Sequence, residues 1–245
     1  MKYIFGNWKM YLNSDESIAF AEKLKKEKLK NKNMEIALFP TALAIVGVQK
    51  VLQKSGVYFG AQNCAWAPKG AYTGAISALM FKEAGCKYAL VGHSERRHVF
   101  GESNEDIRKK LEAVIDAGLI PVLCIGETKE DKDTDKTSYR LKKQLMEALQ
   151  GLNINGNRII IAYEPVWAIG TGVPCLSADA DDIHGFIKQE LKKYIKENAA
   201  VLYGGSVNAE NVCSYTKLET VDGVLVGGAS VKIDAFIPLI KAVRN

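Results

Sequence analysis

The feature that most constrains the fold of this chain is a regular alternation of short apolar runs and amphipathic segments along its 245 residues. The apolar runs are rich in β-branched and aromatic residues, whereas the segments between them repeat apolar residues near the helical period. We count eight such strand–helix units of ~30 residues, about the length of one strand–helix–strand step. Strands that alternate with helices form a parallel sheet, so we predict a closed (β/α)₈ barrel that occupies residues 1–245 as one domain.

The predicted elements follow from these runs. Strands are predicted at Tyr3–Trp8, Glu35–Phe39, Tyr58–Ala61, Tyr88–Val91, Pro121–Ile125, Ile159–Tyr163, Val201–Tyr203 and Gly223–Val226. Helices are predicted at Ser14–Lys30 with Ser14 as N-cap, Ala44–Lys54, Leu79–Ala84, Asn104–Ala117, Tyr139–Leu149, Ala180–Glu197, Ala209–Thr216 and Ala235–Val243. The charged run Lys129–Lys136 is predicted to be a surface loop. An open doubly wound sheet is the alternative, although no Gly-x-Gly-x-x-Gly follows the first strand.

Composition and charge narrow the class of protein. With 47% hydrophobic and 25% charged residues, the chain is ordinary for a soluble globular protein, and no stretch approaches the ~20 apolar residues of a membrane span. The N-terminus Met1–Lys9 is interrupted too soon for a signal peptide. The net charge of +5 is spread over predicted helix faces, so we predict neither nucleic-acid nor membrane binding, although a positive field would attract a small anion.

Cysteine and histidine usage bears on metals and on the cellular compartment. The five cysteines are an odd number without a Cys-x-x-Cys pair, which argues against a disulfide framework and a zinc site. It favours a reducing, cytoplasmic location. The three histidines lack the spacing of metal ligands, so we predict no metal.

The stretch Ile159–Gly172 carries the strongest local indication of chemistry. Its apolar run reads as a buried strand that ends at Glu164, because Pro165 follows at once. A carboxylate at the end of a buried parallel strand is placed to act as a base, since burial raises its pKa. The apolar and glycine residues that follow have the composition of a lid. The alternative is a strand followed by a surface loop with an incidental glutamate.

In a barrel of this kind, functional groups come from the carboxyl ends of the strands. The first predicted strand ends in Gly6-Asn7-Trp8-Lys9, which offers an amide and an ammonium group, and His93 follows the fourth strand. The seventh and eighth strands end in the glycine-rich turns Gly204–Ser206 and Gly227–Gly228. Glycine lets backbone N–H groups approach an oxyanion, and a helix that follows adds a favourable dipole, so these turns predict a phosphate site.

Each of these residues has a structural alternative. Lys9 could be a surface lysine, and His93 could hold a loop through its ring nitrogens. Arg96 and Arg97 could make ion pairs or interface contacts, and Tyr203 could simply pack. The combination of a carboxylate, an imidazole, a cation and an anion cradle on separate strand ends favours one reactive site.

Five segments resemble the signature set of the triosephosphate isomerase family in their order and spacing, and they span essentially the whole chain. They are Gly6–Lys9, Gly92–Arg97, Tyr163–Gly172, Tyr203–Val207 and Gly227–Gly228. The resemblance implies an aldose–ketose isomerase of glycolysis and gluconeogenesis. Such an enzyme interconverts dihydroxyacetone phosphate and D-glyceraldehyde 3-phosphate through an enediolate, without a cofactor.

The resemblance also implies roles for single residues. Glu164 would move the proton between the two carbons, and neutral His93 would polarise the carbonyl. Lys9 would stabilise the developing oxyanion, Asn7 would hold the substrate, and Glu95 would support Lys9. Ile169 and Leu225 resemble the apolar pair that closes on the base. The residues implied in phosphate binding are Gly170, Ser206, Gly227 and Gly228.

The resemblance further implies a homodimer. The long loop Gln62–Gly74 resembles the dimerisation loop of the family, in which Thr73 would reach into the partner. The family commonly carries a glutamate just after the Thr-Gly of this loop, where it pairs with an arginine of the other subunit; here that position is Ala75, so Arg96 would lack that contact. We therefore predict a dimer weaker than is usual in the family.

The far hinge of the predicted lid also departs from the family, which uses a small polar triplet there. Here the hinge contains Pro174, which fixes φ near −65°. We expect altered lid kinetics with catalysis retained.

Two other functions fit part of the pattern. A Schiff-base aldolase that acts on a phosphorylated sugar could use Lys9, and borohydride trapping would detect its adduct. A non-catalytic binding barrel should lack Lys9, His93 or Glu164, and all three are present.

Overall fold

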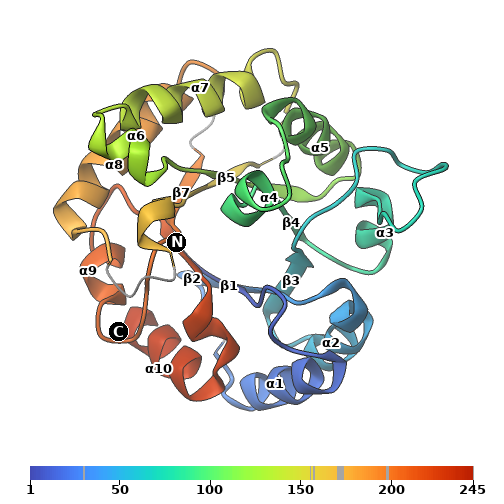
Figure 1. The fold of residues 1–245 in the computed structure, drawn as a ribbon. Helices are drawn as coiled ribbons and strands as arrows, with labels where there is room; N and C mark the ends of the chain where they lie inside the picture. Colours follow the sequence, from blue (N-terminus) through green and yellow to red (C-terminus); the bar gives the residue numbers. More distant parts are fainter. Residues whose placement is uncertain (30, 155, 157, 170–173, 197–198, 245) are drawn as a thin grey trace.

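The computed structural model describes residues 1–29, 31–154, 156, 158–169, 174–196 and 199–244. Within these residues, eight strands form a closed, all-parallel barrel in sequence order (Figure 1). The strands are β1 (Lys2–Asn7), β2 (Met34–Phe39), β3 (Val57–Ala61), β4 (Tyr88–Val91), β5 (Ile120–Ile125), β6 (Ile160–Tyr163), β7 (Ala200–Tyr203) and β8 (Gly223–Val226). β8 pairs with β1, for example Leu225 opposite Phe5, and this pairing closes the barrel. The predicted (β/α)₈ fold is confirmed.

The helices form a ring around the barrel (Figure 1). They are α1 (Ser14–Lys26), α2 (Ile45–Leu52), α3 (Ala78–Glu83), α4 (Ser94–His98), α5 (Asn104–Asp116), α6 (Lys129–Asp133), α7 (Thr137–Leu149), α8 (Ser177–Leu191), α9 (Val212–Thr216) and α10 (Ile233–Arg244). Short 3₁₀ helices lie at η1 (Ala42–Ala44), η2 (Val166–Ala168) and η3 (Gly228–Val231). Within the described residues, no helix is long and apolar enough to cross a membrane.

Two apolar layers hold the barrel together. Side chains alternate along each strand: in β4, Tyr88 and Leu90 join the cluster inside the barrel, whereas Ala89 and Val91 join the layer between strands and helices. Aromatic side chains inside the barrel pack against one another; for example, the ring centroids of Phe5 and Tyr88 lie 4.8 Å apart. Because both faces of every strand are buried, the strands read as continuous apolar runs in the sequence.

Several predicted helices are wrong in detail. The N-cap of α1 is Asn13, whose side chain accepts the Glu16 N–H while the Glu16 carboxylate accepts the Asn13 N–H, so Ser14 is the first helical residue. The predicted end of that helix, Lys30, lies outside the described residues. α8 ends at Leu191, where Lys193 N–H bonds to Glu190 O in a tighter turn; the predicted end at Glu197 is also outside the described residues.

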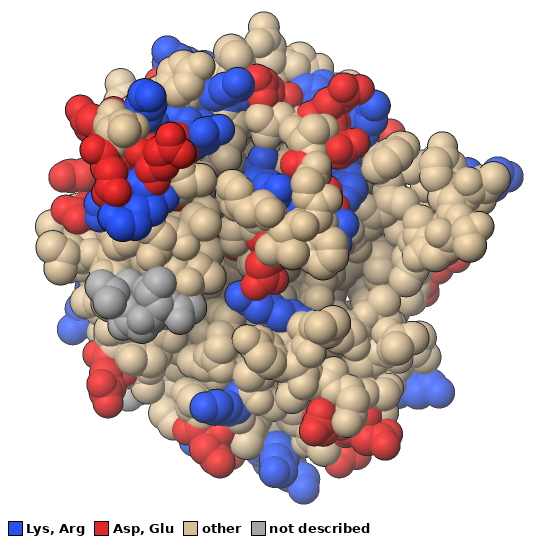
Figure 2. Space-filling model, in the orientation of Figure 1, with Lys and Arg blue, Asp and Glu red and all other residues tan. Residues whose placement is uncertain are grey.

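The charged run Lys129–Lys136 is partly helical, which corrects the predicted loop. Thr128 and Asp131 form a reciprocal capping box that begins α6. Arg140 also donates to the Asp131 carboxylate at 2.9 Å. In Figure 2, mixed acidic and basic side chains gather over α6 and α7, away from the centre of this face. This run is therefore a charged, solvated surface around a short capped helix.

Candidate active site

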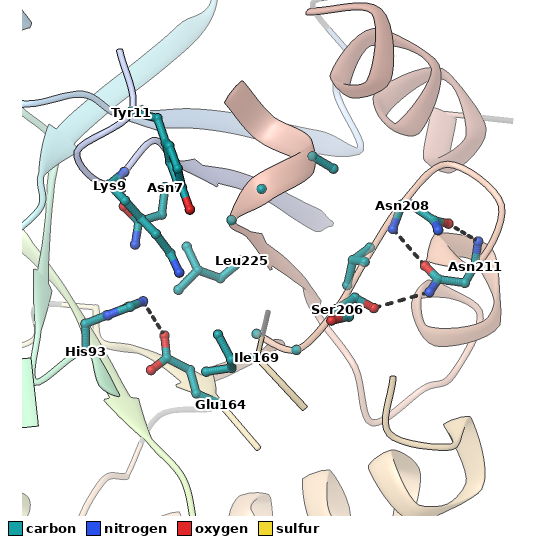
Figure 3. A pocket seen from close by; sticks show the side chains of 16 residues that line it. Asn7, Lys9, Tyr11, His93, Glu164, Ile169, Ser206, Asn208, Asn211 and Leu225 are labelled. Atoms are coloured by element: carbon teal, nitrogen blue, oxygen red, sulfur yellow. Dashed lines mark hydrogen bonds and ion pairs between the residues drawn. The ribbon is translucent and has the colours of Figure 1, made fainter. Parts of the chain in front are cut away.

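The carboxyl ends of the strands converge on a cavity of about 280 Å³ (Figure 3). We call it the active-site pocket. Nine residues predicted for the site line it: Asn7, Lys9, His93, Glu164, Ile169, Ser206, Leu225, Gly227 and Gly228. They come from the ends of β1, β4, β6, β7 and β8, so the closed barrel brings together groups that are far apart in sequence. Of the other predicted site residues, Glu95 pairs with Lys9 and lines a neighbouring hollow, whereas Gly170 lies outside the described residues.

Glu164 follows β6 and is held from several directions. Its backbone N–H donates to Ile125 O at 2.7 Å, and its Oε2 accepts the Ser94 N–H at 2.8 Å. Its Oε1 lies 3.2 Å from Nε2 of His93 (Figure 3). A Cβ on Gly126 would overlap the carbonyl of Glu164, so the close approach of β5 requires glycine there. The residue is 2% exposed, and the carboxylate is therefore fixed and largely dry.

His93 is the N-cap of α4, and this position determines its tautomer. Its Nδ1 accepts the Glu95 N–H at 3.2 Å, so Nδ1 carries no proton. The imidazole is therefore neutral with its proton on Nε2, the atom that faces Glu164. The helix α4 that fixes this geometry was not predicted from the sequence.

Lys9 adopts a backbone conformation that is uncommon for a side-chain-bearing residue, with φ of 50°. Two side chains stabilise it: Asn7 Oδ1 accepts the Lys9 N–H at 3.0 Å, and Gln62 Nε2 donates to Lys9 O at 2.7 Å. The ammonium group lies 2.7 Å from the Glu95 carboxylate. This turn directs the cation into the pocket opposite Glu164 and His93 (Figure 3).

The other side of the pocket is formed by the two glycine-rich turns and by apolar side chains. Gly227 and Gly228 begin η3, and Ser206 Oγ donates to Ala168 O at 2.8 Å, which joins the turn after β7 to the segment after β6. Ile169 and Leu225 flank Glu164 on its open side (Figure 3). The pocket thus has one apolar wall beside the carboxylate and one backbone-rich wall suited to an oxyanion.

Tyr11, Asn208 and Asn211 are among the lining residues that sequence reasoning missed. Asn208 and Asn211 hydrogen-bond to each other's backbone, with Asn208 N–H donating to Asn211 Oδ1 at 2.9 Å. Their position depends on how the loop after β7 folds back over the pocket. An Asn-x-x-Asn pair just before α9 is the one signal that could have indicated a capped turn there.

A buried carboxylate, Glu127, supports the segment after Glu164. Its Oε1 accepts hydrogen bonds from Trp167 Nε1 at 2.7 Å and from Tyr163 Oη at 3.0 Å. The Lys132 ammonium lies 3.4 Å from the centroid of the Trp167 indole. Burial raises the pKa of Glu127, and the hydrogen bonds from Trp167 and Tyr163 partly offset this shift.

Two ionisable neighbours of Glu164 keep their ordinary charge states. Burial lowers the pKa of Arg97 to about 10, so it remains cationic near neutral pH, where it donates to Gly92 O and Cys124 O. Burial, together with the negative charge of Glu164, raises the pKa of the Cys124 thiol well above its usual range. Glu164 is thus accompanied by one cation and one neutral thiol.

The residues predicted for a dimer contact lie outside the active-site pocket. Thr73 belongs to the exposed loop that projects from the barrel between β3 and α3 (Figure 1). Arg96 pairs with Glu102 of its own chain at 2.6 Å. Arg96 also lines a second hollow of about 400 Å³, which adjoins Asn7 and His93.

Metal-binding potential can be judged only where the chain is described. In those parts, no three or more His, Cys, Asp or Glu side chains lie together in a way that could hold a metal ion.

Comparisons with known proteins agree with this geometry. Residues 2–243 match the family model described as Triosephosphate isomerase. A triosephosphate isomerase from Dehalococcoides mccartyi (strain CBDB1) is 40% identical over 240 residues, which cover 96% of this chain and 94% of the relative. One from Aquifex aeolicus is 40% identical over 242 residues, with 98% of each chain covered. The crystal structure of triosephosphate isomerase from Bartonella henselae superposes with a TM-score of 0.89 at 34% identity, covering 100% of this chain and 99% of the other.

Proposed function

The chain belongs to the triosephosphate isomerase family, and we infer that the residues of the active-site pocket carry out the proton transfer of that family. The reaction is the reversible interconversion of dihydroxyacetone phosphate and D-glyceraldehyde 3-phosphate, a step of glycolysis. One observation carries the assignment of roles: a buried carboxylate and a neutral imidazole contact each other, with an ammonium group and two glycine-rich turns around the same cavity.

We propose that Glu164 is the base. Its carboxylate would take the proton from the carbon next to the carbonyl and return it to the neighbouring carbon. His93 Nε2–H would donate its proton to the substrate carbonyl oxygen as that oxygen gains charge, which suits its neutral tautomer. Nε2 would then take the proton of the hydroxyl group on the neighbouring carbon, so that this oxygen becomes the new carbonyl. The substrate would enter between the two side chains and replace their mutual contact at 3.2 Å. The reaction only moves protons within the substrate, so it requires no redox partner.

The remaining groups would stabilise charge. Lys9, oriented by Asn7 and Glu95, would face the developing oxyanion. Backbone N–H groups of Gly227 and Gly228, with Ser206, would bind the phosphate, and the sequence motif adds Gly170 to this set. Ile169 and Leu225 would exclude water beside Glu164, which would strengthen it as a base.

The test is a coupled assay of glyceraldehyde 3-phosphate isomerisation with the unmodified chain and with Glu164→Asp. Shortening the side chain withdraws the carboxylate by about 1 Å, so kcat should fall by about 10²-fold or more. Turnover that is unchanged in the variant would remove Glu164 from the role of base. A Schiff-base aldolase would leave a reduced adduct on Lys9 after borohydride treatment with substrate. This chain should leave none.

We also propose that the chain forms a homodimer through the loop that contains Thr73. The second hollow, lined by Ala75, Arg96 and Phe100 and adjoining the catalytic side chains, could accept that loop from a partner. Large apolar side chains are exposed around it, with Met10 93% and Phe100 64% accessible. In Figure 2 the projecting loop carries mainly uncharged atoms.

We place the enzyme in the cytoplasm as a single catalytic domain over residues 1–245. All five cysteines are free in the structure, which fits a reducing compartment.

A further inference from the structure

A buried tyrosine outside the active-site pocket connects two of its elements. Tyr215 lies on α9 and is 2% exposed. Its hydroxyl donates a hydrogen bond of 2.5 Å to the backbone carbonyl of Cys175. Cys175 lies just before α8, at the end of the segment that begins after Glu164. This single bond therefore fixes the far end of that segment against the outer layer of the barrel.

Tyr203, the last residue of β7, holds the same peptide from its other side. Its hydroxyl accepts the Cys175 N–H at 3.1 Å. The rings of Tyr203 and Tyr215 are stacked, with centroids 4.1 Å apart and planes inclined by 14°. The backbone N–H and C=O of Cys175 are thus both bound by this tyrosine pair, and all three side chains are buried.

The tyrosine pair also contacts the turn after β7. A Cβ on Gly205 would overlap the hydroxyl and ring of Tyr203, so the backbone of the turn lies directly against that ring. The next residue, Ser206, lines the pocket and donates to Ala168 O at 2.8 Å. A shift of the Tyr203 ring would therefore move the turn, and the stacked Tyr215 ring opposes such a shift.

We propose that Tyr215 is a positioning residue for the phosphate end of the substrate. It holds Tyr203 and Cys175 in place, and through them the Gly205–Ser206 backbone, so that the donors of this turn are fixed before the substrate binds. The proposal rests on the proposed function, because it takes this turn as part of the phosphate site. Glu164 and His93 lie on other strand ends and do not contact Tyr215.

The experiment uses Tyr215→Phe and compares two substrates. The variant keeps the stacked ring and removes the hydroxyl that donates to Cys175 O and that also hydrogen-bonds to the Tyr203 hydroxyl. For glyceraldehyde 3-phosphate, kcat/KM should fall about three- to tenfold, mainly through KM, as expected for one buried hydrogen bond. Competitive inhibition by inorganic phosphate should weaken by the same factor. For glyceraldehyde, which has no phosphate, isomerisation should be unchanged. Tyr203→Phe, which removes the acceptor for Cys175 N–H, should give the same pattern.

Thr216→Val is the matched control. Thr216 is a buried neighbour on α9 whose hydroxyl donates to Val212 O inside the helix, at 3.0 Å. It should alter stability and leave both substrates unaffected. Equal losses on both substrates in Tyr215→Phe, or unchanged kinetics with the phosphorylated one, would overturn the proposal. Glu164→Asp in the same assays tests the proposed function separately, since it should impair both substrates alike.

Discussion

Nε2 of His93 lies 3.2 Å from Oε1 of Glu164, while Nδ1 of the same ring accepts the backbone N–H of Glu95. One imidazole thus caps α4 and presents its only N–H group to the active-site pocket. Asparagine is a good N-cap, so His93→Asn should retain the cap and lose the Nε2 donor. We expect kcat to fall by about 10²- to 10⁴-fold with an unchanged thermal unfolding midpoint. A loss of less than tenfold in a folded variant would show that the donor is dispensable.

Lys9 offers a second test because another lysine shares its backbone conformation. Lys9 has φ of 50°, and Lys54, in a turn after α2, has φ of 61°. Lys9→Met should lower kcat/KM by about 10²-fold or more, since it removes a preorganised charge beside the reacting oxygen. Lys54→Met changes a similarly strained site far from the pocket and should leave kcat/KM unchanged. Comparable losses in the two variants would indicate a backbone effect and no electrostatic role for Lys9.

The fold was predictable because each strand of a closed parallel barrel is buried on both faces. The run at Tyr88–Val91 is apolar throughout, since alternate side chains enter different layers. The five-residue helices α4 and α6 were not predicted, because little more than one helical turn cannot repeat an apolar stripe. The capping pair Thr128 and Asp131 was the local evidence for α6, and the charged residues around it obscured this pattern.

The candidate site was predictable to the extent that it consists of strand ends. Asn7 ends β1, Glu164 directly follows β6 and His93 lies two residues after β4, so the closed barrel must bring them together. Contacts that depend on loop paths were not predictable. Trp167 bonds to Glu127 across 40 positions of sequence, and no local pattern identifies such a pair.

Glu127 makes stability depend on pH in a defined direction. Burial raises its pKa in the folded state, so between about pH 4.3 and that raised value the folded protein holds a proton that the unfolded chain has lost. Its contribution to the free energy of unfolding is fully present below this window and is lost as the pH rises through it. Glu127→Gln cannot titrate. The free energy of unfolding of the variant minus that of the unmodified chain should therefore increase from pH 4 to pH 7.

Urea unfolding at pH 4, 5, 6 and 7 measures this difference. Trp167→Phe removes a donor that stabilises the charged form of Glu127. In a chain that is otherwise unmodified, the free energy of unfolding should therefore fall more steeply as the pH rises. If the difference in free energy of unfolding between Glu127→Gln and the unmodified chain is the same at every pH, Glu127 does not have a raised pKa in the folded protein.

The proposed dimer can be tested at Met10, which is 93% exposed beside the second hollow. Met10→Lys should change the stability of an isolated subunit little, because the side chain is almost fully exposed. In a dimer, the same substitution would place a charge in the interface. Sedimentation velocity should show a larger fraction of monomer than in the unmodified chain at equal concentration. Tyr139→Lys, at a position 66% exposed on α7, is the control and should not change the sedimentation.

For the unmodified chain, dissociation should be measurable at concentrations above nanomolar, since Ala75 provides no partner for an arginine across the interface.

Pro174 should influence the kinetics of the loop after Glu164. It is exposed and is followed by Cys175, whose peptide is fixed by Tyr203 and Tyr215. Because proline fixes φ near −65°, a pivot at this position would have little conformational freedom to lose if the loop acts as the predicted lid. Pro174→Thr restores that freedom, so we expect KM to rise about two- to fivefold and the exchange rate of the loop, read from NMR relaxation dispersion at Trp167, to change. Catalysis itself should persist, because Glu164 is held separately by Ser94 and Ile125. Unchanged KM and exchange rates would show that the pivot lies elsewhere, and a loss of kcat as large as in Glu164→Asp would mean that Pro174 helps to position the base.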